Sequence, residues 1–280
     1  METLLKNVVM VPTDFSEVCT NAMNQAAEAA KILNFKVVLL HVIDSNTKSL
    51  LKKEGKDSSW IEDKLEVIAK ELEKEMGVPT AYIAKEGNIF ETIPEVASEI
   101  GASLIFLGTH GKVGMQKLTG SYALKVITSS PVPVIVVQKR YVEGGIKNIV
   151  LPMTSDAGPW EKTKWASHIS KQFKAKIDIF QIHGDESLEE TVHVITKYFE
   201  ENNVAFSVTI AEKSGNFTKQ VIDHATSVNA GMIMIMTNPE KGFKEFLLGS
   251  YDEELIFNTS QIPVMCINPR DVNWKKIVIY

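Results

Sequence analysis

Short hydrophobic runs alternate with longer amphipathic stretches along this chain. In the first half of the chain, the amphipathic stretches cover 16–33, 61–76, 89–100 and 120–129, with apolar residues at helical spacing. The runs themselves are strand-length and nearly continuous, which is typical of strands covered on both faces. This alternation predicts a parallel sheet with helical crossovers. The predicted strands of the first half cover 8–11, 37–43, 80–84, 104–107 and 134–137.

The same order of elements is written twice. Lys6–Thr13 (KNVVMVPT) returns 140 residues later as Lys147–Thr154 (KNIVLPMT). Gly120-Ser121-Tyr122 returns 129 residues later as Gly249-Ser250-Tyr251. Because the order of these matches is preserved, the chain reads as two consecutive copies of one unit.

The two copies differ in length. The offset between them falls because the first half carries about a dozen extra, mostly polar residues between Asp44 and Glu66, which predicts a loop or a short helix there. We expect two tandem doubly wound α/β domains, 1–143 and 144–280, each with a five-stranded parallel sheet flanked by helices.

Composition excludes several classes of protein. The chain has 280 residues, 44% of them hydrophobic, and a formal net charge of −5, which disfavours disorder and a nucleic-acid partner. Its two cysteines lie far apart in the sequence, which favours a reducing compartment. With no predicted targeting segment or membrane span, we expect a soluble, cytoplasmic protein.

Candidate binding residues follow the first and fourth predicted strands, because open α/β sheets bind ligands beyond the carboxyl ends of their strands. Glycines permit a close backbone approach to phosphate, and a helix that begins at Gly120 offers free N–H groups to an anion. A carboxylate at Asp14 would accept hydrogen bonds from a ribose or an adenine amine. The alternative is that the glycines only turn the chain and that Asp14 caps the first helix. These candidates are Pro12, Thr13, Asp14, Gly108, Thr109, His110, Gly111, Gly120, Ser121 and Tyr122.

These segments, in this order, resemble the universal stress protein family, and two consecutive copies resemble its tandem form. The segments on which this resemblance rests are Pro-Thr-Asp-Phe-Ser, Leu-Leu-His-Val, Gly-Thr-His-Gly followed by Gly-Ser, and Ser-Pro-Val-Pro-Val-Ile-Val-Val. The resemblance implies a Rossmann-like, adenine nucleotide alpha hydrolase-like fold with strand order 3-2-1-4-5. It also implies ATP as the ligand, with Asp14 and Val42 facing the adenosine. The family's phosphate motif, G-x2-G-x9-G-[ST], is matched by Gly108, Gly111, Gly120 and Ser121.

The first copy differs from the family's phosphate motif in one place, and the second copy differs from it in more. Eight residues separate Gly111 from Gly120, one fewer than in the motif, so the loop is either tightened or turns Ser121 away from the phosphates. In the second copy Thr154 replaces Asp14. Ile182 replaces Val42 there, and Thr237 and Glu240 are aligned with Gly108 and Gly111. We therefore expect the second copy not to bind ATP.

Catalytic chemistry has little support in the sequence. No G-x4-G-K-[ST] loop, nucleophile elbow, catalytic carboxylate pair or metal-binding spacing is visible. His41 lies in a predicted strand and is interpreted as a packed or capping histidine, and Cys19 and Cys266 as inert thiols. We expect no enzyme, no catalytic residues and no resident metal, with Mg²⁺ present only beside a bound triphosphate.

The resemblance implies a stress-response protein that senses or regulates through bound nucleotide and a regulatory protein partner. Two alternatives stay open, a nucleotide-free interaction scaffold and a slow ATPase. The family also pairs its fifth strands across a dimer interface. We therefore expect an internal pseudo-dimer in which 134–137 runs beside 264–267, and leave a further homodimer open.

Overall fold

The structure is a computed structural model, and it describes residues 7–110, 120–154, 159–237 and 250–268. The chain divides into two compact units between Glu143 and Gly144. Each unit has its own strands and its own covering helices. Within the described ranges, no helix combines the length and the hydropathy that a membrane span requires.

The first unit has the predicted alternation of strands and helices. Its strands are parallel and follow the order β3-β2-β1-β4-β5. Because β1 pairs with both β2 and β4, the strand order reverses between β1 and β4. The elements are β1 (Val8–Pro12), α1 (Glu17–Leu33), β2 (Lys36–Ile43), α2 (Ser45–Glu54), α3 (Ser59–Met76), β3 (Thr80–Glu86), α4 (Ile89–Glu99), β4 (Leu104–Gly108), α5 (Gly120–Ser129) and β5 (Val134–Val137).

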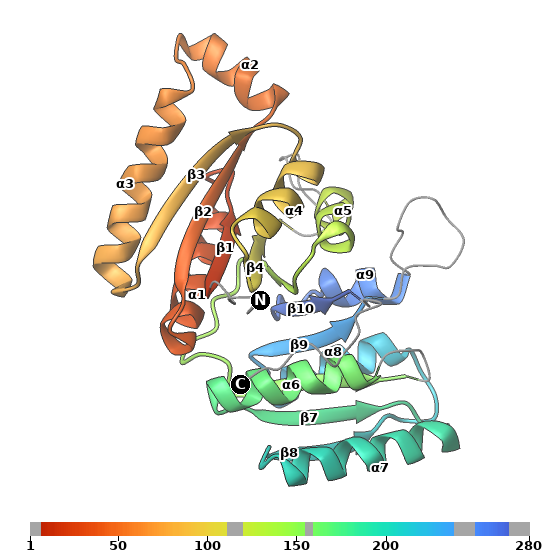
Figure 1. Ribbon diagram of the computed structural model, residues 1–280. Helices are drawn as coiled ribbons and strands as arrows, with labels where there is room; N and C mark the ends of the chain where they lie inside the picture. Colours follow the sequence, from red (N-terminus) through yellow and green to blue (C-terminus); the bar gives the residue numbers. More distant parts are fainter. Residues whose placement is uncertain (1–6, 111–119, 155–158, 238–249, 269–280) are drawn as a thin grey trace. The chain divides into compact units, whose positions relative to one another are not determined.

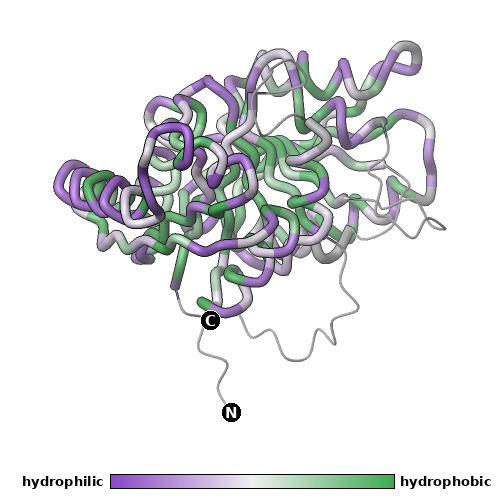
Figure 2. The backbone as a smooth tube through the Cα atoms, turned by 90° about the horizontal axis from the view of Figure 1, so that it is seen from above, coloured by the Kyte–Doolittle hydropathy of each residue, from purple (hydrophilic) through white to green (hydrophobic). Residues whose placement is uncertain are grey.

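Helices cover both faces of this sheet, as the continuous hydrophobic runs predict. Helices α1 and α3 contact each other and pack on one face, and α4 and α5 contact each other on the opposite face (Figure 1). Every residue of β1, β4 and β5 is buried. Figure 2 shows the hydrophobic colour gathered along the strands, while the helices alternate between hydrophobic and hydrophilic turns. The core therefore lies between the sheet and its two helical layers.

The start of helix α1 packs closely against the end of β4, and alanine fills much of the buried side of the helix. The helix ends at Asn34, whose φ of 56° gives the left-handed cap that stops an α-helix. A Cβ added to Gly108 at the end of β4 would lie 2.8 Å from the carbonyl oxygen of Val18. The first turn of α1 is thus in backbone contact with β4. The buried alanines are Ala22, Ala26, Ala27, Ala29 and Ala30.

The second unit repeats this topology. Its described strands are parallel and follow the order β8-β7-β6-β9-β10, which is again 3-2-1-4-5. One helix, α7, connects β7 to β8, where the first unit has both α2 and α3. The elements are β6 (Asn148–Met153), α6 (Pro159–Phe173), β7 (Lys176–Gln181), α7 (Glu186–Glu201), β8 (Phe206–Ile210), α8 (Phe217–Ser227), β9 (Met232–Met236), α9 (Ser250–Ile256) and β10 (Val264–Ile267).

The predicted fold class and strand order are confirmed in both units. The extra residues of the first unit form α2, so the short-helix alternative for this insertion is right. Asp44 caps that helix, since its carboxylate accepts a hydrogen bond from the Thr47 N–H. The pairing of the two fifth strands concerns the placement of one unit against the other, and it stays a prediction.

Candidate functional site

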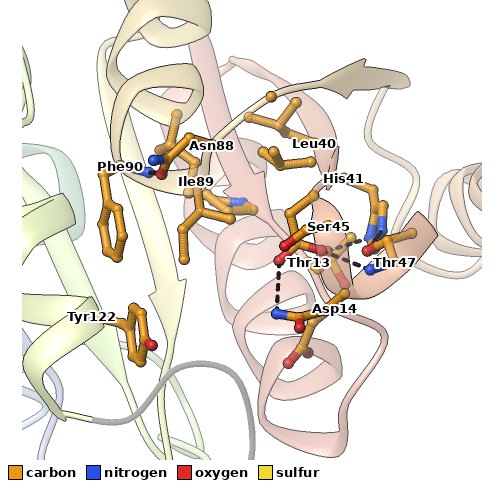
Figure 3. A pocket seen from close by; sticks show the side chains of 16 residues that line it. Thr13, Asp14, Leu40, His41, Ser45, Thr47, Asn88, Ile89, Phe90 and Tyr122 are labelled. Atoms are coloured by element: carbon orange, nitrogen blue, oxygen red, sulfur yellow. Dashed lines mark hydrogen bonds between the residues drawn. The ribbon is translucent and has the colours of Figure 1, made fainter. Parts of the chain in front are cut away.

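A pocket of about 750 Å³ opens at the carboxyl ends of β1 and β2. One wall comes from these strand ends and the start of α2, and the other from the start of α4 and from Tyr122 of α5 (Figure 3). Pockets of this size hold small ligands. The lining residues are Pro12, Thr13, Asp14, Leu40, His41, Val42, Asp44, Ser45, Asn46, Thr47, Gly87, Asn88, Ile89, Phe90, Ile93 and Tyr122.

Asp14 reaches this pocket from the loop between β1 and α1. Its Oδ1 accepts hydrogen bonds from the Ser16 N–H at 3.0 Å and from the Cys19 thiol at 3.2 Å. Burial raises the pKa of Asp14, but the hydrogen bonds and the nearby His110 outweigh it, so this pKa lies below its ordinary value. The carboxylate is ionised at neutral pH and can accept hydrogen bonds from a ligand. Ser16 is the N-cap of α1, so the capping role proposed for Asp14 is wrong.

His41 lies in β2 and lines the same wall. It is buried, with 5% of its surface exposed. Its Nδ1 lies 2.8 Å from the Thr13 carbonyl oxygen, and its Nε2 lies 3.3 Å from the Thr47 hydroxyl (Figure 3). Its ring stacks on Phe15 at 4.6 Å between centroids. The interpretation of His41 as a packed histidine is right about its burial but overlooks its place in the pocket.

The opposite wall carries two aromatic rings, those of Phe90 and Tyr122. Asn88 caps α4, since its Oδ1 accepts a hydrogen bond from the Phe90 N–H at 2.9 Å. The rings of Phe90 and Tyr122 stack with an interplanar angle of 4° and 5.3 Å between centroids (Figure 3). Lys125 Nζ lies 5.1 Å from the centre of the Phe90 ring. The Asp14 carboxylate and the two stacked rings therefore lie on opposite walls of the pocket. This arrangement suits a polar ligand that carries a planar group.

The structure brings together some of the residues predicted from the sequence. Pro12, Thr13 and Asp14 line the pocket from β1 and its following loop, Val42 from β2, and Tyr122 from α5. The sequence-based prediction does not include several lining residues, because it rests mainly on the loops after the first and fourth strands. The rule that ligands bind beyond the carboxyl ends of strands also applies to the second and third strands, and would have found them. The missed residues are Leu40, His41, Asp44, Ser45, Asn46, Thr47, Gly87, Asn88, Ile89, Phe90 and Ile93.

Gly108, Thr109 and His110, which end or directly follow the fourth strand, are not among the described residues that line the pocket. Gly108 contacts the backbone of Val18, and Thr109 is fully buried with its N–H bonded to the Val137 carbonyl. His110 lies close enough to Asp14 to lower the pKa of that carboxyl. The Nε2 of His110 is buried and has no hydrogen-bond partner among the described residues. These contacts explain Gly108 and Thr109 by packing.

The remaining predicted residues belong to the glycine loop and to α5. Gly120 and Ser121 are the first two residues of α5, immediately before Tyr122. Gly111 lies outside the described residues. The phosphate role predicted for these three residues stays a prediction.

In the second unit, the strand register corrects one alignment. Val9 pairs with Leu104 in the first unit and Ile149 with Met232 in the second, so the offset at this strand is 128. The counterpart of Gly108 is therefore Met236, and Thr237 corresponds to Thr109. The single-residue difference falls beyond β9, and Glu240 lies outside the described residues.

Other counterparts of the first pocket have changed type in the second unit. At the offset of 140 that holds for β6, α6 and β7, Thr154 stands for Asp14, Gln181 for His41 and Ile182 for Val42. Gln181 is 3% exposed, and its Nε2 has no hydrogen-bond partner in the part of the chain that the structure describes. The second unit therefore lacks the carboxylate and the histidine that form the first pocket.

A buried lysine is a further difference between the second unit and the first. Lys162 of α6 donates a hydrogen bond to the Pro152 carbonyl, and Pro152 corresponds to the pocket residue Pro12. Burial lowers the pKa of Lys162 to about 8, although Asp252 of α9 opposes this shift. A cationic side chain thus lies at the strand end where the first unit has its pocket.

Metal binding finds no support in the described part of the chain, where no three His, Cys, Asp or Glu side chains are grouped to hold an ion. Of the methionines of β9, Met232 and Met234 are buried in the core and Met236 is half-buried. The ring of His224 stacks on Phe180 with 4.8 Å between centroids.

The family follows from comparison with known proteins. The family model described as "Universal stress protein family" matches residues 7–138. Universal stress protein MJ0531 of Methanocaldococcus jannaschii is 33% identical over 49% of this chain and 85% of its own length. Universal stress protein MJ0577 of the same organism is 30% identical over 47% of this chain and 94% of its own length. The chain belongs to the universal stress protein family.

Solved structures extend the likeness to the whole chain. A universal stress protein from Archaeoglobus fulgidus aligns with a TM-score of 0.78 and 19% identity, over 94% of this chain and 98% of that one. The protein PA1789 from Pseudomonas aeruginosa aligns with a TM-score of 0.64 and 16% identity, over 96% of this chain and 95% of that one. At these identities the likeness concerns the fold. Since the single-domain relatives cover half of this chain and both halves share one topology, it is a tandem universal stress protein.

The two thiols are expected to be unreactive in the folded protein. Burial and the charge of Asp14 raise the pKa of Cys19 to about 12, and burial also raises the pKa of Cys266. The thiolate is the reactive form, so iodoacetamide at pH 8 should alkylate neither residue within minutes. In guanidinium chloride the same treatment should label both. Rapid labelling of Cys19 in the native protein, read by mass spectrometry, would show that the loop carrying Asp14 opens.

Proposed function

We propose that the first unit binds ATP or a related adenine nucleotide in the Asp14 pocket, and that the chain acts in stress response as a non-catalytic sensor or regulator. The observation that carries this proposal is an ionised carboxylate at the point where the strand order reverses, on the rim of a pocket of about 750 Å³. Open α/β sheets bind nucleotides at this point.

The residues present fit an adenine nucleotide. Asp14 would accept hydrogen bonds from ribose hydroxyls or the adenine amine, and Val42 would provide apolar contact for the base. Tyr122 lines the pocket from the first turn of α5, so the positive end of that helix lies on the pocket side and favours phosphate. A bound triphosphate would bring Mg²⁺ with it, as a companion of the ligand.

The second unit is proposed to take no nucleotide. Thr154 stands in place of Asp14, and the buried Lys162 donates to the backbone at the equivalent strand end. We further propose that the two fifth strands pair as an internal pseudo-dimer, because pairing removes the exposed edges of β5 and β10. A regulatory protein partner would then read the occupancy of one site per chain.

Asp14→Ala is expected to weaken ATP binding at least tenfold in isothermal titration calorimetry of the full chain. Hydrogen bonds to a charged group contribute about 1.5–3 kcal/mol, and this substitution removes the charged acceptor. The wild type should bind close to one ATP per chain. Asp14→Asn keeps the Oδ1 acceptor for the Ser16 N–H and should give an intermediate affinity.

Thr154→Ala is the matched control in the second unit and should leave the affinity unchanged. Thermal melts would show that each variant is folded. Unchanged affinity in both Asp14→Ala and Ser121→Ala would reject the site. Absence of ATP binding by the wild type, together with no nucleotide in the mass spectrum of the purified protein, would favour the scaffold alternative. ATP turnover that is lost with Asp14 or His110 would instead favour the ATPase.

A further inference from the structure

Asp14 lies between two residues that are both held by His41. The carbonyl of Thr13 accepts a hydrogen bond from His41 Nδ1, and the ring of Phe15 stacks on the imidazole. The Phe15 N–H in turn donates to the Thr13 hydroxyl at 3.0 Å. The backbone on each side of the carboxylate is therefore fixed by one buried histidine.

The backbone at Phe15 needs such support. Its φ is 66°, in the left-handed region that bulky side chains avoid. Strained residues of this kind persist only where surrounding contacts hold them, and they gather at functional sites. Here the contacts are His41 and Lys64, whose Nζ lies 4.0 Å from the centre of the Phe15 ring. Both groups lie within 5 Å of the centre of the Phe15 ring.

The same contacts reach the insertion that distinguishes the first unit. Because a carbonyl oxygen can only accept a hydrogen bond, His41 Nδ1 is the donor to the Thr13 carbonyl. The other ring nitrogen, Nε2, faces the hydroxyl of Thr47 in the first turn of α2. Lys64 lies in α3, with its Nζ 5.1 Å from the ring of Trp60. Thr13, His41 and Thr47 are all buried, which protects their hydrogen bonds from water.

The second unit provides an internal comparison. It has one helix, α7, in place of α2 and α3, and Gln181 in place of His41. The Nε2 of Gln181 is buried without a hydrogen-bond partner among the described residues. The histidine and its partner Thr47 thus occur in the unit that keeps the aspartate, and both are missing from the unit that has lost it.

We propose that His41 is a positioning residue that holds the Asp14 loop for ligand and couples it, through Thr47, to the insertion formed by α2 and the start of α3. This inference rests on the proposed function for the identity of the ligand. The coupling itself is a property of the ligand-free protein. Occupancy of the pocket would change the packing around Trp60, so the insertion is the element that reports on bound nucleotide.

The coupling is tested first without ligand, by hydrogen exchange with mass spectrometry on the full chain. His41→Gln copies the second unit, and Thr47→Val removes the hydroxyl with little change of shape. Both are expected to speed the exchange of amides in the 12–20 segment at least fivefold. Lys48→Ala is the control on α2, since Lys48 is exposed and pairs with Glu86 on the surface. Unchanged exchange in both His41→Gln and Thr47→Val would overturn the proposal.

The second test uses ATP and tryptophan fluorescence. The wild type should show a fluorescence change on binding that Trp60→Phe abolishes. His41→Gln should weaken ATP about tenfold, and Thr47→Val about threefold with loss of the Trp60 signal. ATP binding without a Trp60 signal would overturn the reporting role and leave the nucleotide site standing. Absence of ATP binding would reject the nucleotide, while the exchange experiment would still decide the role of His41.

Discussion

Gly108→Ala is expected to destabilise the first unit by about 3 kcal/mol, the upper range for an overpacked core position. The added Cβ would lie 2.8 Å from the Val18 carbonyl oxygen, 2.9 Å from its carbon and 3.0 Å from the Cys19 nitrogen. These are backbone atoms of α1, so no side-chain rotation relieves the overlap. The whole first turn of the helix would have to move away from β4.

Urea denaturation measures this effect as a fall in the midpoint at constant slope. Gly55→Ala is the matched control, because Gly55 has a φ of 66° but nothing within 4 Å of an added Cβ. It should cost about 1 kcal/mol, from conformation alone. A loss at Gly108 no larger than that at Gly55, with a large fall in ATP affinity, would restore the phosphate role that the sequence motif implies.

The second unit shows that the strand itself does not demand glycine here. Met236 stands at the equivalent position of β9, and the strand order is the same. What excludes a side chain at Gly108 is the approach of α1, which the buried alanines of that helix permit. A helix displaced by Gly108→Ala would also carry Asp14 away, since the carboxylate is bonded to Ser16 and Cys19 at the start of α1.

The sequence predicted the fold because its evidence is local and repeated. Runs such as 104–107 and 134–137 can only be strands of a parallel sheet when helical patterns alternate with them. The second copy of the unit shows the same order of elements and so supports each assignment independently. The carboxylate Asp14 was also found, because it directly follows a strand. These features depend on neighbours in the chain alone.

The rest of the site depends on distances that the sequence does not contain. Gly108 lies in a phosphate motif, yet its role is decided by the gap between β4 and α1. His41 lies in the Leu-Leu-His-Val segment, but that segment does not reveal its role, because its partners Thr13 and Thr47 come from different elements. The alignment of Gly108 with Thr237 was wrong by one residue, since only the strand register locates the length difference beyond β9.

The second large effect concerns the buried lysine of the second unit. Lys162 is 9% exposed, donates to the Pro152 carbonyl and occupies the position of Ala22 in the first unit. Its counter-charge Asp252 corresponds to Ala123. Two small apolar residues have thus been replaced by two ionisable ones. Burial outweighs the attraction of Asp252 and lowers the pKa of Lys162 to about 8, against 10.5 for an ordinary lysine.

This shift predicts that stability rises with pH in a defined window. Below pH 8 the lysine is charged in both the folded and the unfolded chain, and its desolvation opposes folding in full. Between about pH 8 and 10.5 the folded protein has released the proton that the unfolded chain still binds. The free energy of unfolding then increases by about 1.4 kcal/mol per pH unit, towards a total of about 3 kcal/mol.

Lys162→Met should remove this contribution while keeping the length of the side chain. Between pH 7 and 9, urea denaturation should show the wild type gaining about 1 kcal/mol relative to Lys162→Met. The raised pKa values of Cys19 and Cys266 lower stability at alkaline pH, but they act equally on both proteins and cancel in the difference. Equal pH dependence of the two proteins would show that Lys162 keeps an ordinary pKa. A confirmed difference would mean that the second unit holds, at the strand end where the first unit has its pocket, a buried charge that destabilises it at neutral pH.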